Sequence, residues 1–126
     1  MSSEIKEKLA QLNIEDFIWI IYFLIILMSY YSNHLERKYL INSSLVYKEK
    51  YRKVMVIIFS ILIVVYVYFL QDSFKSLVSL KPSDSSKKKK LVYLSFLASL
   101  FIAISGFIFL YISIVDENLD VELAFN

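Results

Sequence analysis

The chain contains 126 residues, 58% of them hydrophobic, with one glycine, one proline and no cysteine. This composition excludes a disordered or collagen-like chain, a disulfide scaffold, and any catalytic or metal site that depends on cysteine. Fourteen basic residues against twelve acidic residues give a net charge of +2, which is too balanced for nucleic-acid binding by the chain as a whole.

Three long stretches carry no charged residue, at residues 17–35, 54–71 and 91–115. As α-helices with a rise of about 1.5 Å per residue they would be about 28, 27 and 37 Å long, against a hydrocarbon core of about 30 Å. They lack the polar face that a soluble three-helix bundle needs. The sequence therefore predicts an all-α, polytopic integral membrane protein with three transmembrane helices and short polar loops, in one domain over residues 1–126.

The segment before the first span indicates that this span is retained. Acidic residues such as Glu4 and Glu7 alternate with Lys6 and Lys8, where a secretory signal peptide would have a basic region. The apolar run is also too long for such a peptide, and no small-residue cleavage site follows it. We expect insertion of the helices alone to hold the protein in the membrane.

The two loops contain the expected helix ends. Asn and Ser at 42–44 predict a break, with one helix ending near Ile41 and the next beginning near Leu45. In the second loop, the spacing of apolar residues in 73–78 suggests a short interfacial helix. Pro82 then stops any helix, and Ser83, Asp84 or Ser85 are the candidate caps of the third helix.

The basic residues do not orient the chain decisively. The leader has two, the first loop six, the second loop six and the tail none, so three crossings place similar totals on the two faces. Lysines before the third span favour a cytoplasmic second loop, whereas Arg37 and Lys38 after the first span favour the opposite. We expect a multi-pass cell-membrane protein with a cytoplasmic N-terminus and an outside C-terminus, and the balanced count leaves dual orientation open.

The third span contains small residues at helical spacing. They are Ser95, Ser99, Ala103, Gly106 and Ser113, and they share one helical face. Small residues allow a neighbouring helix to approach closely, so this small-residue stripe is a candidate helix-packing seam. It could pack on the other two helices of the chain, or on a second copy or a larger membrane protein.

A run of four lysines precedes the third span, at Lys87, Lys88, Lys89 and Lys90. Such a run next to a membrane is a topology signal, and it also suits anionic headgroups. The basic residues at 48–53 alternate with tyrosines and are interpreted as interfacial anchors rather than a nucleic-acid surface.

The acidic tail, residues 116–126, alternates apolar with polar or small residues. The apolar positions are Leu119, Val121, Leu123 and Phe125. A period of two suits an extended strand that adds to a partner's sheet, and a frayed acidic end is the alternative.

No residue pattern indicates catalysis. The charge-free stretches hold no acidic or basic side chain except His34 at the end of the first, and one histidine makes no metal site. We therefore expect no enzyme, no cofactor and no metal. The leading hypothesis is an accessory or interaction subunit, with the lipid bilayer, a second copy or a larger membrane protein as partner. The alternative is a self-assembling holin-like pore or small channel. Lys, Ile, Tyr and Phe are frequent, which suits an AT-rich genome and favours a bacterial plasma membrane as the location.

Overall fold

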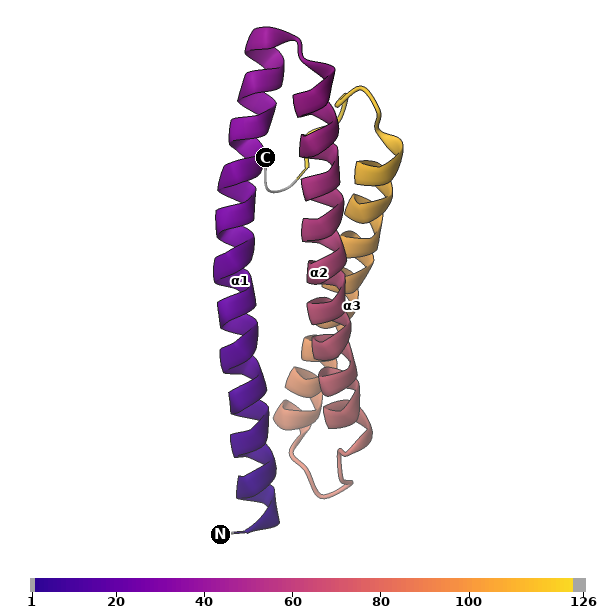
Figure 1. Ribbon diagram of the computed structural model, residues 1–126. Helices are drawn as coiled ribbons and strands as arrows, with labels where there is room; N and C mark the ends of the chain where they lie inside the picture. Colours follow the sequence, from indigo (N-terminus) through magenta and orange to yellow (C-terminus); the bar gives the residue numbers. More distant parts are fainter. Residues whose placement is uncertain (1, 124–126) are drawn as a thin grey trace. The chain divides into compact units, whose positions relative to one another are not determined.

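The computed structural model describes residues 2–123, and the regular elements in that range are all α-helices. Helix α1 comprises Ser3–Asn42, α2 comprises Leu45–Val78 and α3 comprises Ser86–Val115 (Figure 1). Each is long and apolar enough to cross a membrane. The prediction of an all-α fold with three candidate spans is confirmed. The chain divides into two compact units, Met1–Val54 and Met55–Asn126.

Helix α1 is longer than its charge-free stretch. Its 40 residues would measure about 60 Å, about twice the thickness of the hydrocarbon core. Ser2 is the N-cap of the helix, and its Oγ accepts a hydrogen bond from the backbone N–H of Ile5 at 3.2 Å. The charged residues at both ends of α1 therefore continue the helix beyond the apolar stretch instead of forming separate loops.

Within the first unit, Ser43 ends α1. It lies in the left-handed region, with φ 52° and ψ 33°, and its backbone N–H donates to the carbonyl of Tyr39 at 2.7 Å. A left-handed residue directly after a helix is a common helix end, and the chain can reverse there. The helix end predicted near Ile41 lies at Asn42, and the next helix begins at Leu45 as expected.

Two crossed cation–π contacts connect the helices on either side of this turn. Lys38 Nζ of α1 lies 5.0 Å from the centre of the Tyr47 ring of α2, and Lys48 Nζ of α2 lies 5.8 Å from that of Tyr39 of α1. Such contacts are worth about 0.5–1 kcal/mol at exposed sites. Tyr39 and Tyr47 thus bind lysines across the turn. The anchor role that the sequence suggests for the basic residues at 48–53 stays a prediction.

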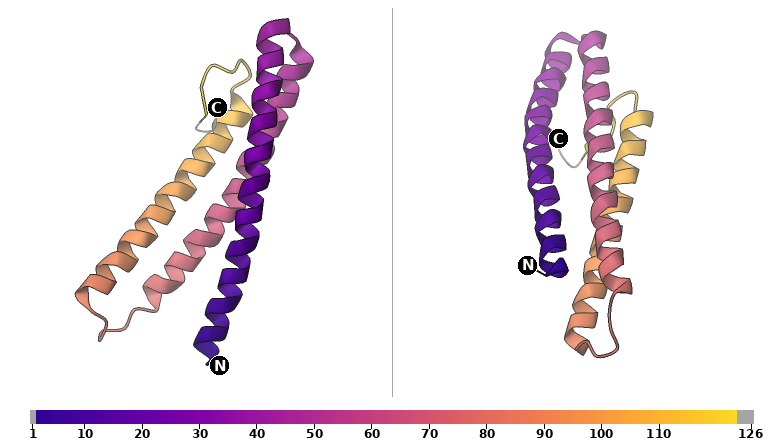
Figure 2. Two further views of the ribbon diagram at one scale, coloured as in Figure 1. Left: turned by 90° about the vertical axis from the view of Figure 1, so that its left-hand side faces the viewer. Right: turned by 60° about the horizontal axis from the view of Figure 1, so that its bottom comes forward.

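Within the second unit, α2 from Met55 onward and α3 run antiparallel and side by side (Figure 2). The rings of Phe59 and Phe109 stack at 5.5 Å, and those of Phe74 and Phe96 lie 5.9 Å apart. From the first pair to the second, the residue number rises from 59 to 74 on α2 and falls from 109 to 96 on α3. These two pairs therefore define the antiparallel register of the α2–α3 hairpin.

The predicted interfacial helix over residues 73–78 is not a separate element. Helix α2 continues through these residues to Val78 without a break. The helix ends shortly before Lys81, and a residue that precedes proline disfavours the helical conformation. The apolar spacing of this segment therefore reflects the last turns of α2.

Candidate functional site

Helices α2 and α3 pack closely at Gly106. A β-carbon at this position would lie 2.9 Å from Cδ2 of Tyr66 and 3.4 Å from Cγ1 of Ile63. The first distance is shorter than side chains normally allow, so the Tyr66 ring occupies the space that a larger residue at 106 would need. Gly106 permits this close approach of α2, which is the use that small residues have in membrane helices.

An apolar groove lies beside this contact. It encloses about 270 Å³, and its lining comprises Phe59, Tyr66, Phe101, Ile102, Ser105, Gly106 and Phe109. A cavity of about 150 Å³ can hold a benzene molecule, so the groove has room for one large apolar side chain. The Ser105 hydroxyl already donates to the carbonyl of Phe101 at 2.8 Å, which satisfies its hydrogen in an apolar environment.

The small-residue stripe divides into two parts. Ala103, Gly106 and Ser113 are buried, whereas Ser99 is half-buried and Ser95 is exposed. Ser113 also donates its hydroxyl hydrogen to the carbonyl of Leu110 at 2.8 Å. At Gly106 the stripe contacts α2 of the same chain. Whether the stripe also serves as a seam for a second chain stays a prediction.

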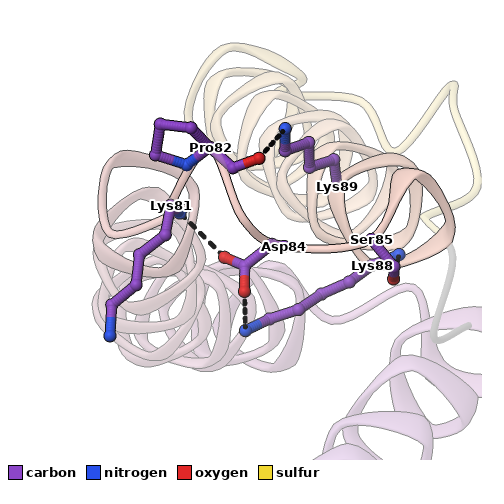
Figure 3. A network of polar contacts seen from close by, with 6 residues as sticks. All are labelled: Lys81, Pro82, Asp84, Ser85, Lys88 and Lys89. Carbon is purple, nitrogen blue, oxygen red and sulfur yellow. Dashed lines mark hydrogen bonds and ion pairs between the residues drawn. The ribbon is translucent and has the colours of Figure 1, made fainter.

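A second candidate site, which is polar, lies in the α2–α3 loop around Asp84 (Figure 3). The Asp84 carboxylate accepts a hydrogen bond from the backbone N–H of Lys81 at 2.7 Å and another from Lys88 Nζ at 3.1 Å. These two interactions lower the pKa of Asp84, with the backbone N–H as the larger cause. Asp84 is therefore ionised at neutral pH, and its contact with Lys88 connects the loop to the first turn of α3.

Two further hydrogen bonds shape the same loop. Ser85 is the N-cap of α3, and its Oγ accepts from the backbone N–H of Lys88 at 3.1 Å. Lys89 Nζ donates to the carbonyl of Pro82 at 3.2 Å. Of the three candidate caps in the sequence, Ser85 takes the position. Of the four-lysine run, Lys87, Lys88 and Lys90 are exposed and Lys89 is half-buried.

The tail differs from the extended strand that its alternation predicts. Asp116 accepts hydrogen bonds from the backbone N–H groups of Asp120 at 3.0 Å and Val121 at 2.9 Å, which folds residues 116–121 into a turn. Leu119 has a φ of 56°, in the left-handed region, and this interrupts the alternation. Leu123 is buried and Val121 is exposed, while Phe125 lies outside the described residues. The partner role of the tail stays a prediction.

His34 is exposed on α1. Among residues 2–123, no group of three His, Asp or Glu side chains is placed to hold a metal ion.

These features define a small α-helical protein of the multi-pass membrane class. Comparison of the chain with protein-family models, with curated proteins and with solved structures gives no match. The assignment of the candidate site therefore rests on the geometry described above.

The groove and its aromatic lining were not predicted from the sequence. Phe101, Ser105 and Phe109 follow one another at steps of four, so they form one ridge of α3 with a small residue between two large ones. A gap in such a ridge leaves a notch unless a neighbouring helix fills it. This spacing was the available signal, but the lining from Phe59 and Tyr66 depends on the register of the hairpin.

Proposed function

We propose that the protein is a non-enzymatic membrane subunit whose α2–α3 hairpin docks against a transmembrane helix of a larger membrane protein. The observation that carries this proposal is the groove, which is open, apolar and bounded by the aromatic rings of Phe101 and Phe109. A bulky apolar side chain of a partner helix fits such a notch, as in the ridges-into-grooves packing of helices.

The position of the groove along the membrane span supports a helix as its occupant. Ser105 is about 21 Å along α3 from Leu91, where the charge-free stretch begins, so the groove lies near the middle of the span. An occupant at that depth must be apolar and must satisfy its own backbone hydrogen bonds, as an α-helix does. The self-assembling pore of the alternative hypothesis would instead need a polar lining, which the Phe and Ile side chains of the groove do not supply.

Replacement of Ser105 by tryptophan tests the proposal by filling the groove. Ser60 on α2 provides a matched control, because it is also an exposed serine whose hydroxyl donates to a carbonyl four residues earlier and it does not line the groove. We expect a stoichiometric partner to copurify in mild detergent with the native chain and with Ser60→Trp. Ser105→Trp should lose it.

A photocrosslinking residue then locates the contact. Introduced at Ile102, which lines the groove and is 50% exposed, it should join the chain to the partner. At Ile108, which is 53% exposed and outside the groove lining, it should not. Adducts that contain only a second copy of the chain, or depolarisation of cells that express it, would contradict the subunit proposal.

We further propose that the protein lies in the plasma membrane of a bacterium, with the leader and the second loop on the cytoplasmic side. The four-lysine run at the start of α3 supports this orientation under the positive-inside rule, because residues 116–126 after α3 contain no lysine or arginine. Single cysteines in place of Ser3 and Asn126 test it on intact cells. Labelling from outside at position 126 alone supports the orientation, and labelling at position 3 alone refutes it.

A further inference from the structure

Positive charge is concentrated at the N-terminal end of α3. Residues 81–90 contain five lysines and one acidic residue, Asp84. The first turn of α3 has no acidic side chain, although the positive end of the helix dipole favours acidic groups there. The lysines therefore repel one another, and they are also repelled by the positive end of the helix dipole. A bound anion would reduce both repulsions.

The loop network divides these lysines into two groups. Lys88 is bound to Asp84, and Lys89 is bound to the carbonyl of Pro82. Within the described residues, the ammonium groups of Lys81, Lys87 and Lys90 make no hydrogen bond or ion pair, and all three residues are exposed. The charge of Lys81 contributes to the lowered pKa of Asp84 without such a contact. The side chain of Lys81 points away from Asp84 (Figure 3).

The position of these free lysines determines which anion they meet. Leu91 begins the charge-free part of α3, so the residues just before it lie at the level of the lipid phosphates when α3 spans a membrane. This holds for either orientation of the chain. A lipid headgroup is thus already present at the site, whereas a nucleic acid or an acidic protein would have to displace it.

We propose that the α2–α3 loop binds the headgroups of anionic phospholipids, with Lys81, Lys87 and Lys90 at the phosphates and Asp84 as an internal competitor that holds Lys88. A topology signal alone requires positive charge but no preference among lipids. The loop we describe has a preference, because its turn is fixed by hydrogen bonds and its free ammonium groups are held at one end of α3. Each basic residue near a membrane surface contributes about a fivefold gain in affinity.

The full chain in detergent tests this binding directly. Phosphatidylglycerol and phosphatidylcholine with the same acyl chains are titrated separately, and bound lipids are counted by native mass spectrometry. We expect phosphatidylglycerol to bind at least tenfold more tightly. Replacement of Lys81, Lys87 and Lys90 together by glutamine should remove that preference, and replacement by arginine should keep it. Circular dichroism checks that the variants remain helical.

A charge-matched control separates a site from a general effect of charge. The corresponding triple glutamine variant at Lys48, Lys50 and Lys53 removes as many charges from the N-terminal part of α2. It should change the preference much less. Equal losses in the two triple variants, or equal affinities of the native chain for the two lipids, would overturn the proposal. Displacement of phosphatidylglycerol by millimolar inorganic phosphate would overturn the assignment to a lipid.

The Asp84→Asn variant tests the competitor. Asparagine retains an oxygen that can accept the Lys81 N–H, so the loop turn is preserved while Lys88 is released. We expect phosphatidylglycerol to bind severalfold more tightly and phosphatidylcholine to be unaffected. An unchanged or weaker affinity for phosphatidylglycerol would show that Asp84 does not compete.

Discussion

Gly106 of α3 lies directly against the ring of Tyr66 of α2, at a separation that leaves no room for a β-carbon. A membrane gives little hydrophobic driving force between helices, so close packing of this kind supplies much of their association. The single glycine of the chain therefore lies at a close contact of the α2–α3 hairpin, in the lining of the groove that we propose as the docking site.

Replacement of Gly106 by alanine should destabilise the hairpin. The added methyl group would force the Tyr66 ring to move, and overpacking of this kind costs about 1–3 kcal/mol. Thermal unfolding in detergent, followed by circular dichroism, measures the change. The neighbouring Ser105→Ala variant is the control, since residue 105 is exposed. Recovery of stability in Gly106→Ala combined with Tyr66→Ala would identify the ring as the cause, and its absence would contradict this account.

The same contact involves one member of the small-residue stripe. Leucine at Gly106 should disturb the packing against α2 within one chain. The sequence showed that the stripe shares one face of α3, because helical periodicity fixes that directly. It did not show which residues of α2 lie opposite, since that depends on the register set by Phe59 with Phe109.

Ser43 offers a prediction of increased stability. It adopts the left-handed conformation, which costs a residue with a side chain roughly 1 kcal/mol and costs glycine little. Ser43→Gly should therefore raise the stability of the turn by up to about 1 kcal/mol, visible as a higher unfolding temperature. Ser44→Gly is the control, because Ser44 is not among the residues with positive φ. An equal rise in that control would contradict the conformational explanation.

The loop at Asp84 should respond to acid in one direction. Its folded pKa is lowered below the ordinary aspartate value of about 3.9, so the stabilisation it provides is present at neutral pH and is lost as the pH falls through the folded pKa. The titration of the Asp84 carboxyl carbon by NMR measures that pKa. We expect a midpoint below the ordinary value in the native chain and a higher one in Lys88→Gln. A native midpoint at or above the ordinary value would refute the network.

The sequence predicted the helices better than the polar contacts between them. Long charge-free stretches fix spans because the hydrocarbon core imposes one length on every crossing, and the break at Ser43–Ser44 follows from local preferences. The hydrogen-bond partners of Asp84 could not be predicted from the sequence, because Ser83, Asp84 and Ser85 were all candidate caps of α3. Only the fold of the loop assigns the cap to Ser85 and leaves Asp84 to bind Lys88.

The turn after α3 gives a last prediction, on the tail. An extended strand in this segment would require loss of the two hydrogen bonds that Asp116 accepts from the backbone N–H groups of Asp120 and Val121. Asp116→Ala removes both acceptors. Because a hydrogen bond to a charged group is worth about 1.5 kcal/mol or more, amide hydrogen exchange at residues 120 and 121 should become at least about tenfold faster. Glu117→Ala is the control, and it should leave both exchange rates unchanged. Slow exchange in Asp116→Ala would mean that other contacts hold the turn.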